Sequence, residues 1–312
     1  MAGSEKERKE QELTTYNPCP LCSGTTYIKV GEARDELVSK RIFPLLRCEK
    51  CGMLVTGNAP VPSELGSFYR NKAYISHSDT HRGLTNRLYH WVRHRTLRSK
   101  YKLIDRLSKG QKGGLIVDVG AGTGYFAAYM QRKGYRVHCI EQDAEARSFI
   151  EKKHHLATSP YLKEAQLPRA GVNFITLWHV LEHIPDLKEH FALFRKLLTA
   201  DGTLILALPN HTSWDAKHYS CSWAAYDVPR HLWHFAPEHI CRLAQNEGFR
   251  LIEKHPMPFD AYYISLLSEQ QRGRKGIIWG YFRAFYAGLR SNYAARRNPT
   301  EASSIIYVFQ LA

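Results

Sequence analysis

The feature that most constrains the fold of this 312-residue chain is a glycine-rich turn between a strand-like and a helix-like segment. Residues 115–119 form a short apolar run, the sequence Asp118-Val-Gly-Ala-Gly-Thr-Gly124 overlaps and follows it, and a helical pattern begins at once. Glycines permit positive φ angles and let the backbone and the first helix amides approach a ligand. This order predicts an α/β domain that binds a ligand at the carboxyl ends of its strands.

The same alternation of short apolar runs and amphipathic runs continues through residues 113–312. Helical periodicity appears between the strand-like segments, in the order expected for β-α units. Such an order favours a mostly parallel, Rossmann-like sheet with helices on both faces. The predicted strands are 115–119, 135–141, 173–178, 203–208, 249–255 and 305–311, and the predicted helices are 125–133, 144–154, 187–198 and 237–247.

The spacing of the glycines separates two cofactor classes. A dinucleotide-binding turn has the pattern G-x-G-x-x-G, whose third glycine would fall at Tyr125. The chain instead has G-x-G-x-G after an acid, which suits a cationic amino-acid cofactor without a phosphate. A second acid, Glu141, ends the next predicted strand after about twenty residues, where a carboxylate can bind both hydroxyls of a ribose.

Further motifs accompany the later strands: W-H-V-L-E-H at 178–183, L-P-N ending at Asn210, and Gly248-Phe at the predicted strand 249–255. With these motifs the chain resembles the class I S-adenosylmethionine-dependent methyltransferases over roughly residues 113–256 and the final strand. The resemblance implies a seven-stranded sheet whose last strand is antiparallel. It also implies cofactor contacts from the glycine turn and the strand ends, namely Asp118, Gly120, Ala121, Gly122, Gly124, Glu141, Gln142, Trp178 and His179.

One position departs from that family pattern. Many members place an acid after the third strand to bind the adenine amine, and here the nearest candidate is Glu164 in the segment Tyr161-Leu-Lys-Glu164. The adenine contact is therefore left without a firm residue.

Four of the seven cysteines occur as two C-x-x-C pairs, which are Cys19, Cys22, Cys48 and Cys51. Each pair presents two sulfurs from one tight turn, and four thiolates so placed can close a tetrahedron around Zn²⁺. Strand-like runs at 25–30 and 42–46 can form the hairpin of a zinc ribbon over residues 17–60. A closed, structural zinc site is predicted, with a redox dithiol as the alternative.

The segments outside these two domains carry weaker signals. Residues 1–16 are highly charged and lack the apolar stretch of a signal peptide, which predicts a disordered N-terminus and a cytoplasmic protein. Residues 61–112 show apolar positions at helical spacing, which predicts a helical linker or lid. The remaining cysteines are expected to be small buried apolar residues, and these are Cys139, Cys221 and Cys241.

Methyl transfer from a sulfonium requires alignment and, for a protic acceptor, a base. Candidate bases follow the predicted strand 173–178 at His179, Glu182 and His183, and others lie in the aromatic loop 223–235. That loop resembles a segment of small-molecule methyltransferases with an N-terminal zinc ribbon, some of which act on nucleotide-linked sugars. The predicted catalytic residues are His183, Tyr226, His231 and His234. The alternatives are a hydrogen-bonding role for His183 at a helix entry and simple packing of the loop aromatics.

The formal net charge of +15 suggests an anionic partner, although basic runs are also common on solvated helix faces. Segments 81–112 and 270–300 hold ten and seven Lys or Arg against one acid and none. Within the insertion 256–302, apolar residues recur every four positions over 277–293, with further apolar residues beside them and arginines flanking the stripe. Such a stripe packs on its own domain or on the second copy of a homodimer, or it contacts a membrane surface.

Three functions follow in order of preference. The first is S-adenosylmethionine-dependent methylation of a small-molecule acceptor, for which an anionic, glycosyl or lipid-linked intermediate is the candidate. The second is RNA methylation, since zinc ribbons and basic stretches occur in nucleic-acid enzymes. It is disfavoured because neither an N-P-P-Y-like motif nor a cysteine follows the predicted strand 173–178. The third, a non-enzymatic zinc-ribbon adaptor, would leave the glycine turn and Glu141 without a role.

Overall fold

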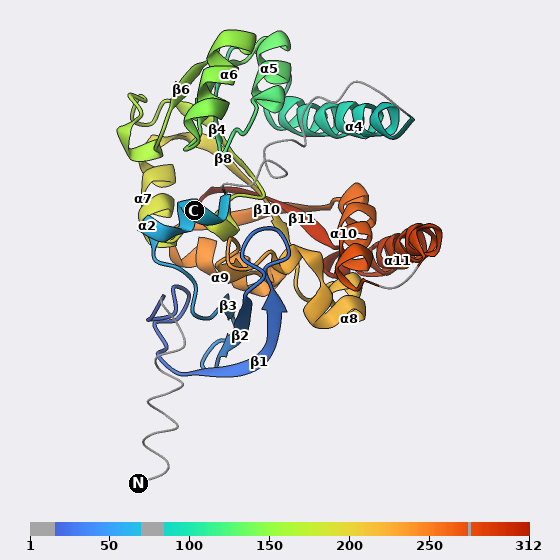
Figure 1. Cartoon of the computed structure of the whole chain (residues 1–312). Coiled ribbons are helices and arrows are strands. Elements are labelled where there is room, and N and C mark those ends of the chain that lie inside the picture. Colours follow the sequence, from blue (N-terminus) through green and yellow to red (C-terminus); the bar gives the residue numbers. More distant parts are fainter. Residues whose placement is uncertain (1–15, 70–83, 274–275) are drawn as a thin grey trace.

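The computed structural model describes residues 16–69, 84–273 and 276–312. Figure 1 shows a large sheet flanked by helices and a smaller sheet built mainly from the first strands of the chain. Helix α4 (Leu84–Leu107) and the pair α10 (Pro258–Gln271) and α11 (Ile277–Arg297) project from one side of this body (Figure 1). The expectation of a disordered N-terminus concerns residues that, except for Tyr16, lie outside the described ones.

The large sheet has the strand order β10-β11-β8-β7-β4-β5-β6. The strands from β8 to β6 pair in parallel, whereas β11 pairs antiparallel with both β8 and β10. The predicted seven-stranded, Rossmann-like sheet with an antiparallel last strand is confirmed. Its strands are β4 (Leu115–Val119), β5 (Arg136–Ile140), β6 (Ala157–Ser159), β7 (Val172–Trp178), β8 (Leu198–Pro209), β10 (Phe249–Pro256) and β11 (Ser304–Leu311).

The connecting helices bury one apolar face each against this sheet. In α7 (Leu187–Leu197), Phe191 and Phe194 are fully buried, and burial of such side chains contributes about 1.5–3 kcal/mol each. The helix begins at Asp186, whose carboxylate accepts a hydrogen bond from the Glu189 amide at 2.9 Å. Helices α5 (Tyr125–Arg132), α6 (Ala144–His154) and α9 (Pro237–Asn246) complete the β-α units. The parallel strands therefore present their carboxyl ends along one edge, where the site lies.

The small sheet contains β1 (Tyr27–Arg34), β2 (Ile42–Cys48), β3 (Leu54–Thr56) and β9 (Trp233–His234), all antiparallel. Its fourth strand comes from the aromatic loop, because Leu54 and Val55 lie opposite His234 and Trp233. Tyr16 joins the same contact, since its ring packs edge-on against Trp233 with centroids 5.4 Å apart. The ribbon predicted over residues 17–60 is thus completed by a strand from the second half of the chain.

The segment 61–112, predicted as a helical linker or lid, contains α2 (Pro62–Leu65), a 3₁₀ turn over Gly66–Tyr69 and α4, and its residues 70–83 lie outside the described ones. One expectation about the cysteines needs correction. Cys139 is buried and Cys241 partly buried, but Cys221 is exposed, since it lies in a short surface turn, Ser220–Ser222.

Candidate functional site

The glycine turn joins β4 to α5, and its three glycines have different reasons to be glycine. Gly120, Gly122 and Gly124 all adopt left-handed φ angles, of 70°, 54° and 72°. A Cβ atom on Gly120 would lie 2.4 Å from Val180, and one on Gly124 would lie 2.8 Å from Ile150. A Cβ atom on Gly122 would meet no described atom within 4 Å. Gly122 therefore faces open space in which a ligand can approach the backbone.

Two carboxylates lie beside this turn. Asp118, near the end of β4, is 2% exposed and accepts a hydrogen bond from the Thr176 hydroxyl at 2.7 Å. Glu141, directly after β5, accepts hydrogen bonds from the Gly122 amide at 2.7 Å and the Asp143 amide at 2.9 Å. Burial raises the pKa of both carboxyl groups, to about 7 for Asp118. A cationic or hydrogen-bond-donating ligand would stabilise the ionised form of both carboxylates.

Trp178 and His179 stand at the end of β7, next to the turn. The indole Nε1 of Trp178 is buried and has no hydrogen-bond partner among the described residues. Lys100 of α4 places its Nζ 4.0 Å from the centre of the Trp178 ring, and burial lowers the pKa of Lys100 to about 8. Burial opposes protonation of His179, but the carboxylates of Asp260, 2.9 Å from its Nε2, and of Glu182, 3.7 Å from its Nδ1, outweigh it and raise the pKa of His179 to about 9. Helix α4 thus covers this end of the sheet.

The remaining predicted cofactor residues occupy the rim of the same region. The Ala121 amide donates to the Ile140 carbonyl at 3.1 Å inside the turn. Gln142 is exposed, and its carbonyl accepts a hydrogen bond from Arg147 at 2.8 Å. Glu164 is also exposed, in the 3₁₀ turn Leu162–Glu164 that follows β6. Its adenine contact stays a prediction.

The candidate catalytic residues fall into two groups. His183 and His231 lie together, with ring centroids 4.5 Å apart, and the Nε2 of His231 is 3.9 Å from the Oε1 of Glu182. His234 is 4% exposed, lies 3.0 Å from the Thr56 hydroxyl through its Nε2, and has a pKa lowered far below its usual range by burial. Tyr226 packs edge-on against the His234 ring, with centroids 5.1 Å apart. The structure therefore places His183 and His231 beside Glu182, and His234 and Tyr226 beside the ribbon.

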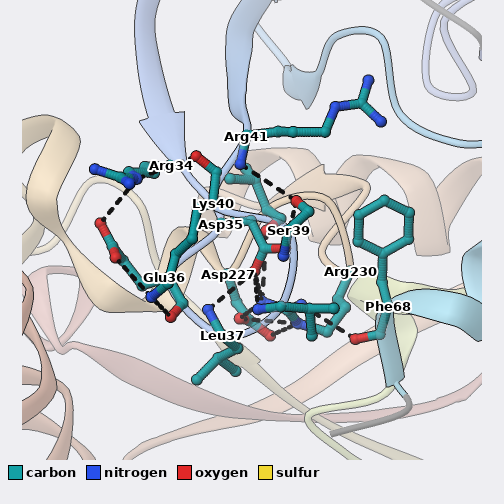
Figure 2. Close-up of polar contacts among 12 residues, drawn as sticks. Arg34, Asp35, Glu36, Leu37, Ser39, Lys40, Arg41, Phe68, Asp227 and Arg230 are labelled. Carbon is teal, nitrogen blue, oxygen red and sulfur yellow. Dashed lines mark hydrogen bonds and ion pairs between the residues drawn. The ribbon is translucent and has the colours of Figure 1, made fainter.

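A buried ion cluster anchors this loop, and sequence reasoning missed it. Figure 2 shows Arg230 reaching both Asp227 of its own loop and Asp35 of the ribbon. Its Nη2 lies 2.6 Å from Asp227 Oδ1 and 3.0 Å from Asp35 Oδ1, and its Nη1 donates to the Phe68 carbonyl at 3.2 Å. The side chains of Arg230 and Asp35 are 1% and 0% exposed. The sequence could have indicated only the ion pair between Asp227 and Arg230, which are three residues apart. Asp35 lies 195 residues from Arg230, so no local pattern links the two.

Main-chain contacts extend this anchor from the ribbon to the turn after β7. The Thr56 hydroxyl donates to the His231 carbonyl at 2.6 Å, and the Thr56 amide donates to the Leu232 carbonyl at 3.0 Å. The Leu232 amide donates in turn to the Glu182 carbonyl at 2.8 Å. The ribbon therefore holds His231 in place against the segment that carries Glu182 and His183.

The four cysteines of the C-x-x-C pairs converge as predicted. Two sulfur pairs are closest, at 3.6 Å between Cys19 and Cys51 and 3.5 Å between Cys22 and Cys48. All four sulfurs lie within 4.8 Å of one another. Sulfurs bound at about 2.3 Å to one tetrahedral Zn²⁺ would be about 3.8 Å apart. The cluster thus has the donor set and the dimensions of a four-thiolate zinc site.

A family model described as a methyltransferase domain matches residues 90–254, more than half of the chain. The chain belongs to this methyltransferase family. Its recognition as a class I S-adenosylmethionine-dependent methyltransferase is confirmed, and the protein is an enzyme. The alternative of a non-enzymatic adaptor is therefore wrong. No curated protein matches the sequence significantly.

Several solved methyltransferases are similar at low sequence identity. Phosphoethanolamine N-methyltransferase 2 of Haemonchus contortus, in complex with S-adenosyl-L-methionine, is 17% identical with a TM-score of 0.47, over 69% of this chain and 52% of that one. The 1,6-didemethyltoxoflavin N1-methyltransferase of Burkholderia thailandensis is 13% identical with a TM-score of 0.48, over 85% and 97%. Geranyl diphosphate C-methyltransferase of Streptomyces coelicolor is 15% identical with a TM-score of 0.47, over 70% and 82%. The chain spans about half the length of the first of these enzymes.

The site of this methyltransferase fits S-adenosylmethionine. The open space over Gly122 admits a ligand close to the backbone, and the unpaired indole N–H of Trp178 can donate to it. Asp118 and the glycine turn would hold the methionine part, and Glu141 would hold the ribose. When bound, the cofactor supplies a methyl group already activated on a sulfonium.

Proposed function

We propose that this methyltransferase modifies a small-molecule acceptor that enters beside His183 and His231. One observation carries the proposal: the strand end with Trp178 and His179 leads within a few residues into the Glu182-His183 turn, and His231 joins that turn from the loop. The chemistry needs an in-line approach and exclusion of water. Lys100 and Trp178 exclude water from the site. Glu141 and the glycine turn orient the methyl donor. Glu182, His183 and His231 contact the group of the acceptor that carries the proton.

Cofactor binding and acceptor class are tested separately. Isothermal titration calorimetry with S-adenosylmethionine should show one site per chain, which Gly122→Val abolishes by filling the space over the turn. Gly66→Val is the matched control, because Gly66 is exposed, lies far from the turn in sequence and has an ordinary negative φ of −54°. Equal affinity in the Gly122→Val variant would contradict the cofactor site.

Formation of S-adenosylhomocysteine is then followed with nucleotide-linked sugars, lipid-linked glycosyl compounds and RNA. Turnover with a sugar or lipid-linked compound supports the proposal. Turnover with RNA alone, together with retention on RNA that weakens as salt rises, would favour the nucleic-acid alternative instead.

We propose in addition that the acceptor is lipid-linked, because α11 presents an apolar face to the exterior. Its large apolar side chains are between 45% and 70% exposed, and they are Ile278, Trp279, Tyr281, Phe282, Phe285, Tyr286, Leu289 and Tyr293. The opposite face carries small buried residues, including Ala284, Ala287 and Ser291. Packing against the described residues, the alternative for this stripe, leaves these side chains largely exposed, although the Phe285 ring stacks on Tyr262 of α10 with centroids 5.6 Å apart.

A membrane surface with anionic lipids matches this face better than a second protein copy. Aromatic rings with basic neighbours are typical of helices that lie in the lipid interface, and Arg290, Arg296 and Arg297 flank the stripe while segment 270–300 has no acid. No helix among the described residues is both long and apolar enough to cross a bilayer. Contact would therefore be peripheral, and the cytoplasmic location stays a prediction.

Co-sedimentation with vesicles tests this contact. Vesicles containing phosphatidylserine should retain the enzyme. The double variant Phe282→Ser, Phe285→Ser should bind these vesicles at least tenfold more weakly. Tyr161→Ser is the matched control, because this aromatic side chain is 45% exposed outside α11. A dimer in light scattering that the double variant dissociates, without vesicle binding, would show that a second copy covers the face.

We also propose that the cysteine cluster holds a structural zinc ion that keeps the ribbon, and with it His231, in position. Elemental analysis should find zinc that Cys22→Ser together with Cys48→Ser removes. Methyl transfer should fall with the zinc, because Thr56 holds the His231 loop. Full activity and folding in a zinc-free preparation would contradict this role.

A further inference from the structure

We propose that Glu182, His183 and His231 form a second metal site, distinct from the cysteine cluster, which binds a divalent first-row transition ion. One donor atom from each of the three side chains lies within 4.8 Å of the other two. Two of the residues come from the turn after β7, and the third comes from the loop that the ribbon holds. The site therefore requires the folded contact between both halves of the chain.

The carboxylate of Glu182 is the first argument. Its side chain is 1% exposed, and both oxygens are buried without a hydrogen-bond partner in the described part of the chain. The imidazole nitrogens nearest to Oε1 are His179 Nδ1 at 3.7 Å and His231 Nε2 at 3.9 Å, and both lie beyond hydrogen-bond distance. A buried carboxylate without a partner is costly, which is why such groups usually pair or coordinate a metal.

The orientation of the two imidazoles is the second argument. The Nδ1 of His231 lies 2.8 Å from the Ala225 carbonyl, and the Nδ1 of His183 lies 3.0 Å from the Arg230 carbonyl. A carbonyl can only accept, so each Nδ1 carries a hydrogen, and in the neutral form of each ring the lone pair lies on Nε2. Metal-bound histidines are oriented in this way, with the second ring nitrogen donating to a main-chain carbonyl or carboxylate. Neutral rings held in this way would offer their Nε2 atoms to an ion from fixed positions.

The donor set indicates the kind of ion. Two imidazoles and one carboxylate leave coordination positions open and suit divalent iron, manganese, cobalt or zinc. Donors at about 2.1 Å from an ion lie roughly 3 to 3.4 Å apart, so the His231 and Glu182 atoms, now 3.9 Å apart, close by less than 1 Å on binding. Resting on the proposed function, the open positions would take an oxygen of the acceptor and ease loss of its proton before the methyl group arrives.

The alternative is a purely structural network, in which protonated histidines balance the Glu182 charge. It predicts no affinity for a metal, because charged imidazoles have no lone pair to offer. The two accounts therefore differ in a direct binding measurement that needs neither cofactor nor acceptor.

The experiment uses the full-length, zinc-loaded protein and Mn²⁺, a hard ion that the four thiolates bind poorly. Electron paramagnetic resonance counts free Mn²⁺ during titration. We expect one bound ion per chain, with affinity reduced at least tenfold in Glu182→Gln. His190→Gln is the matched control, because its Nδ1 also contacts a main-chain carbonyl, that of Asp186 at 2.8 Å, away from the cluster. It should bind Mn²⁺ like the wild type.

Two results would overturn the site: wild-type protein that leaves all Mn²⁺ free, or Glu182→Gln with unchanged affinity. If Glu182→Gln does not fold, His183→Gln supplies the same comparison. Calorimetry with S-adenosylmethionine runs in parallel, so absence of Mn²⁺ with intact cofactor binding refutes the metal site alone. Absence of cofactor binding with intact Mn²⁺ refutes the cofactor site alone.

Discussion

The buried Arg230 cluster makes a quantitative prediction, because it joins the ribbon to the candidate catalytic loop. The substitution Arg230→Met keeps most of the apolar stem and removes the charge. It leaves Asp35 and Asp227 without their guanidinium partner and the Phe68 carbonyl without a donor (Figure 2). Breaking a buried ion pair from one side typically costs about 3–5 kcal/mol of unfolding free energy.

The structure places this variant at the lower end of that range. Asp35 stays fully buried, but Ser39 continues to donate to it from its amide at 2.6 Å and its hydroxyl at 2.7 Å. Asp227 is 20% exposed and can gain water in place of the guanidinium. We therefore expect a loss of about 3 kcal/mol, mostly from the Asp35 carboxylate.

Urea denaturation followed by tryptophan fluorescence measures this loss. Arg34→Met is the matched control, because Arg34 lies in the same region with a side chain 55% exposed and a distant Glu36 partner at 3.8 Å, so about 0–0.5 kcal/mol is expected. Adding Asp35→Asn to Arg230→Met should restore part of the loss, since the orphaned charge disappears. Similar losses for Arg230→Met and Arg34→Met, or a further full loss on adding Asp35→Asn, would refute the reasoning.

Acid titration gives an independent check on the same pair. Burial opposes ionisation of Asp35, but hydrogen bonds from Ser39 and the Arg230 charge outweigh it and lower the pKa of Asp35 to about 2. A carboxyl with a lowered folded-state pKa stabilises the protein above its usual pKa, and this contribution is lost as pH falls towards 2. We expect about 2 kcal/mol to disappear over this window in the wild type. Arg230→Met should show a shallower acid dependence in stability measurements.

Three further predictions use other parts of the molecule. Gly120→Ala should lower the unfolding free energy by about 2 kcal/mol in urea titrations, because its φ is positive and the added methyl group would lie 2.4 Å from Val180; a neutral effect would show that the turn adapts. Cofactor affinity should fall about tenfold per pH unit below pH 7, because Asp118 has a pKa of about 7 and only its ionised form attracts a cationic amino group; calorimetry on Asp118→Asn should remove this dependence. Arg106→Ala should cost about 0.5 kcal/mol at pH 7, since the Arg106 side chain of this ion pair is half-exposed at the surface. Its hydrogen bond lowers the pKa of Glu253 to about 2, so the difference between variant and wild type should vanish as pH falls from 4.5 towards 2.

Features set by neighbours in the sequence could be predicted. The glycine turn, Glu141 at the end of β5 and most strands and helices follow from local periodicity and turn chemistry, which residues close in the chain decide. Shorter or irregular elements could not. Strand β6 has three residues, too few for a period, and β8 begins at Leu198 directly from the end of α7, five residues before its predicted start at residue 203.

Features set by distant contacts were beyond the sequence. His231 was predicted as a candidate catalytic residue from its residue type, but its placement against Glu182 depends on Thr56 and on the pairing of β9 with β3. The isolation of the Glu182 oxygens depends likewise on what surrounds them in space. No periodic pattern records a contact of this kind, because it is made by a few residues from segments far apart in the chain.

The pairing of β3 with β9 has a practical consequence for protein engineering. A chimera that grafts the ribbon onto another methyltransferase, or a fragment that starts at residue 113, would cut a shared sheet and leave strand edges bare on both products. Bare edges invite association between chains. The ribbon is therefore not a transferable cassette, and any exchange of modules must carry the loop with Trp233 and His234 along with it.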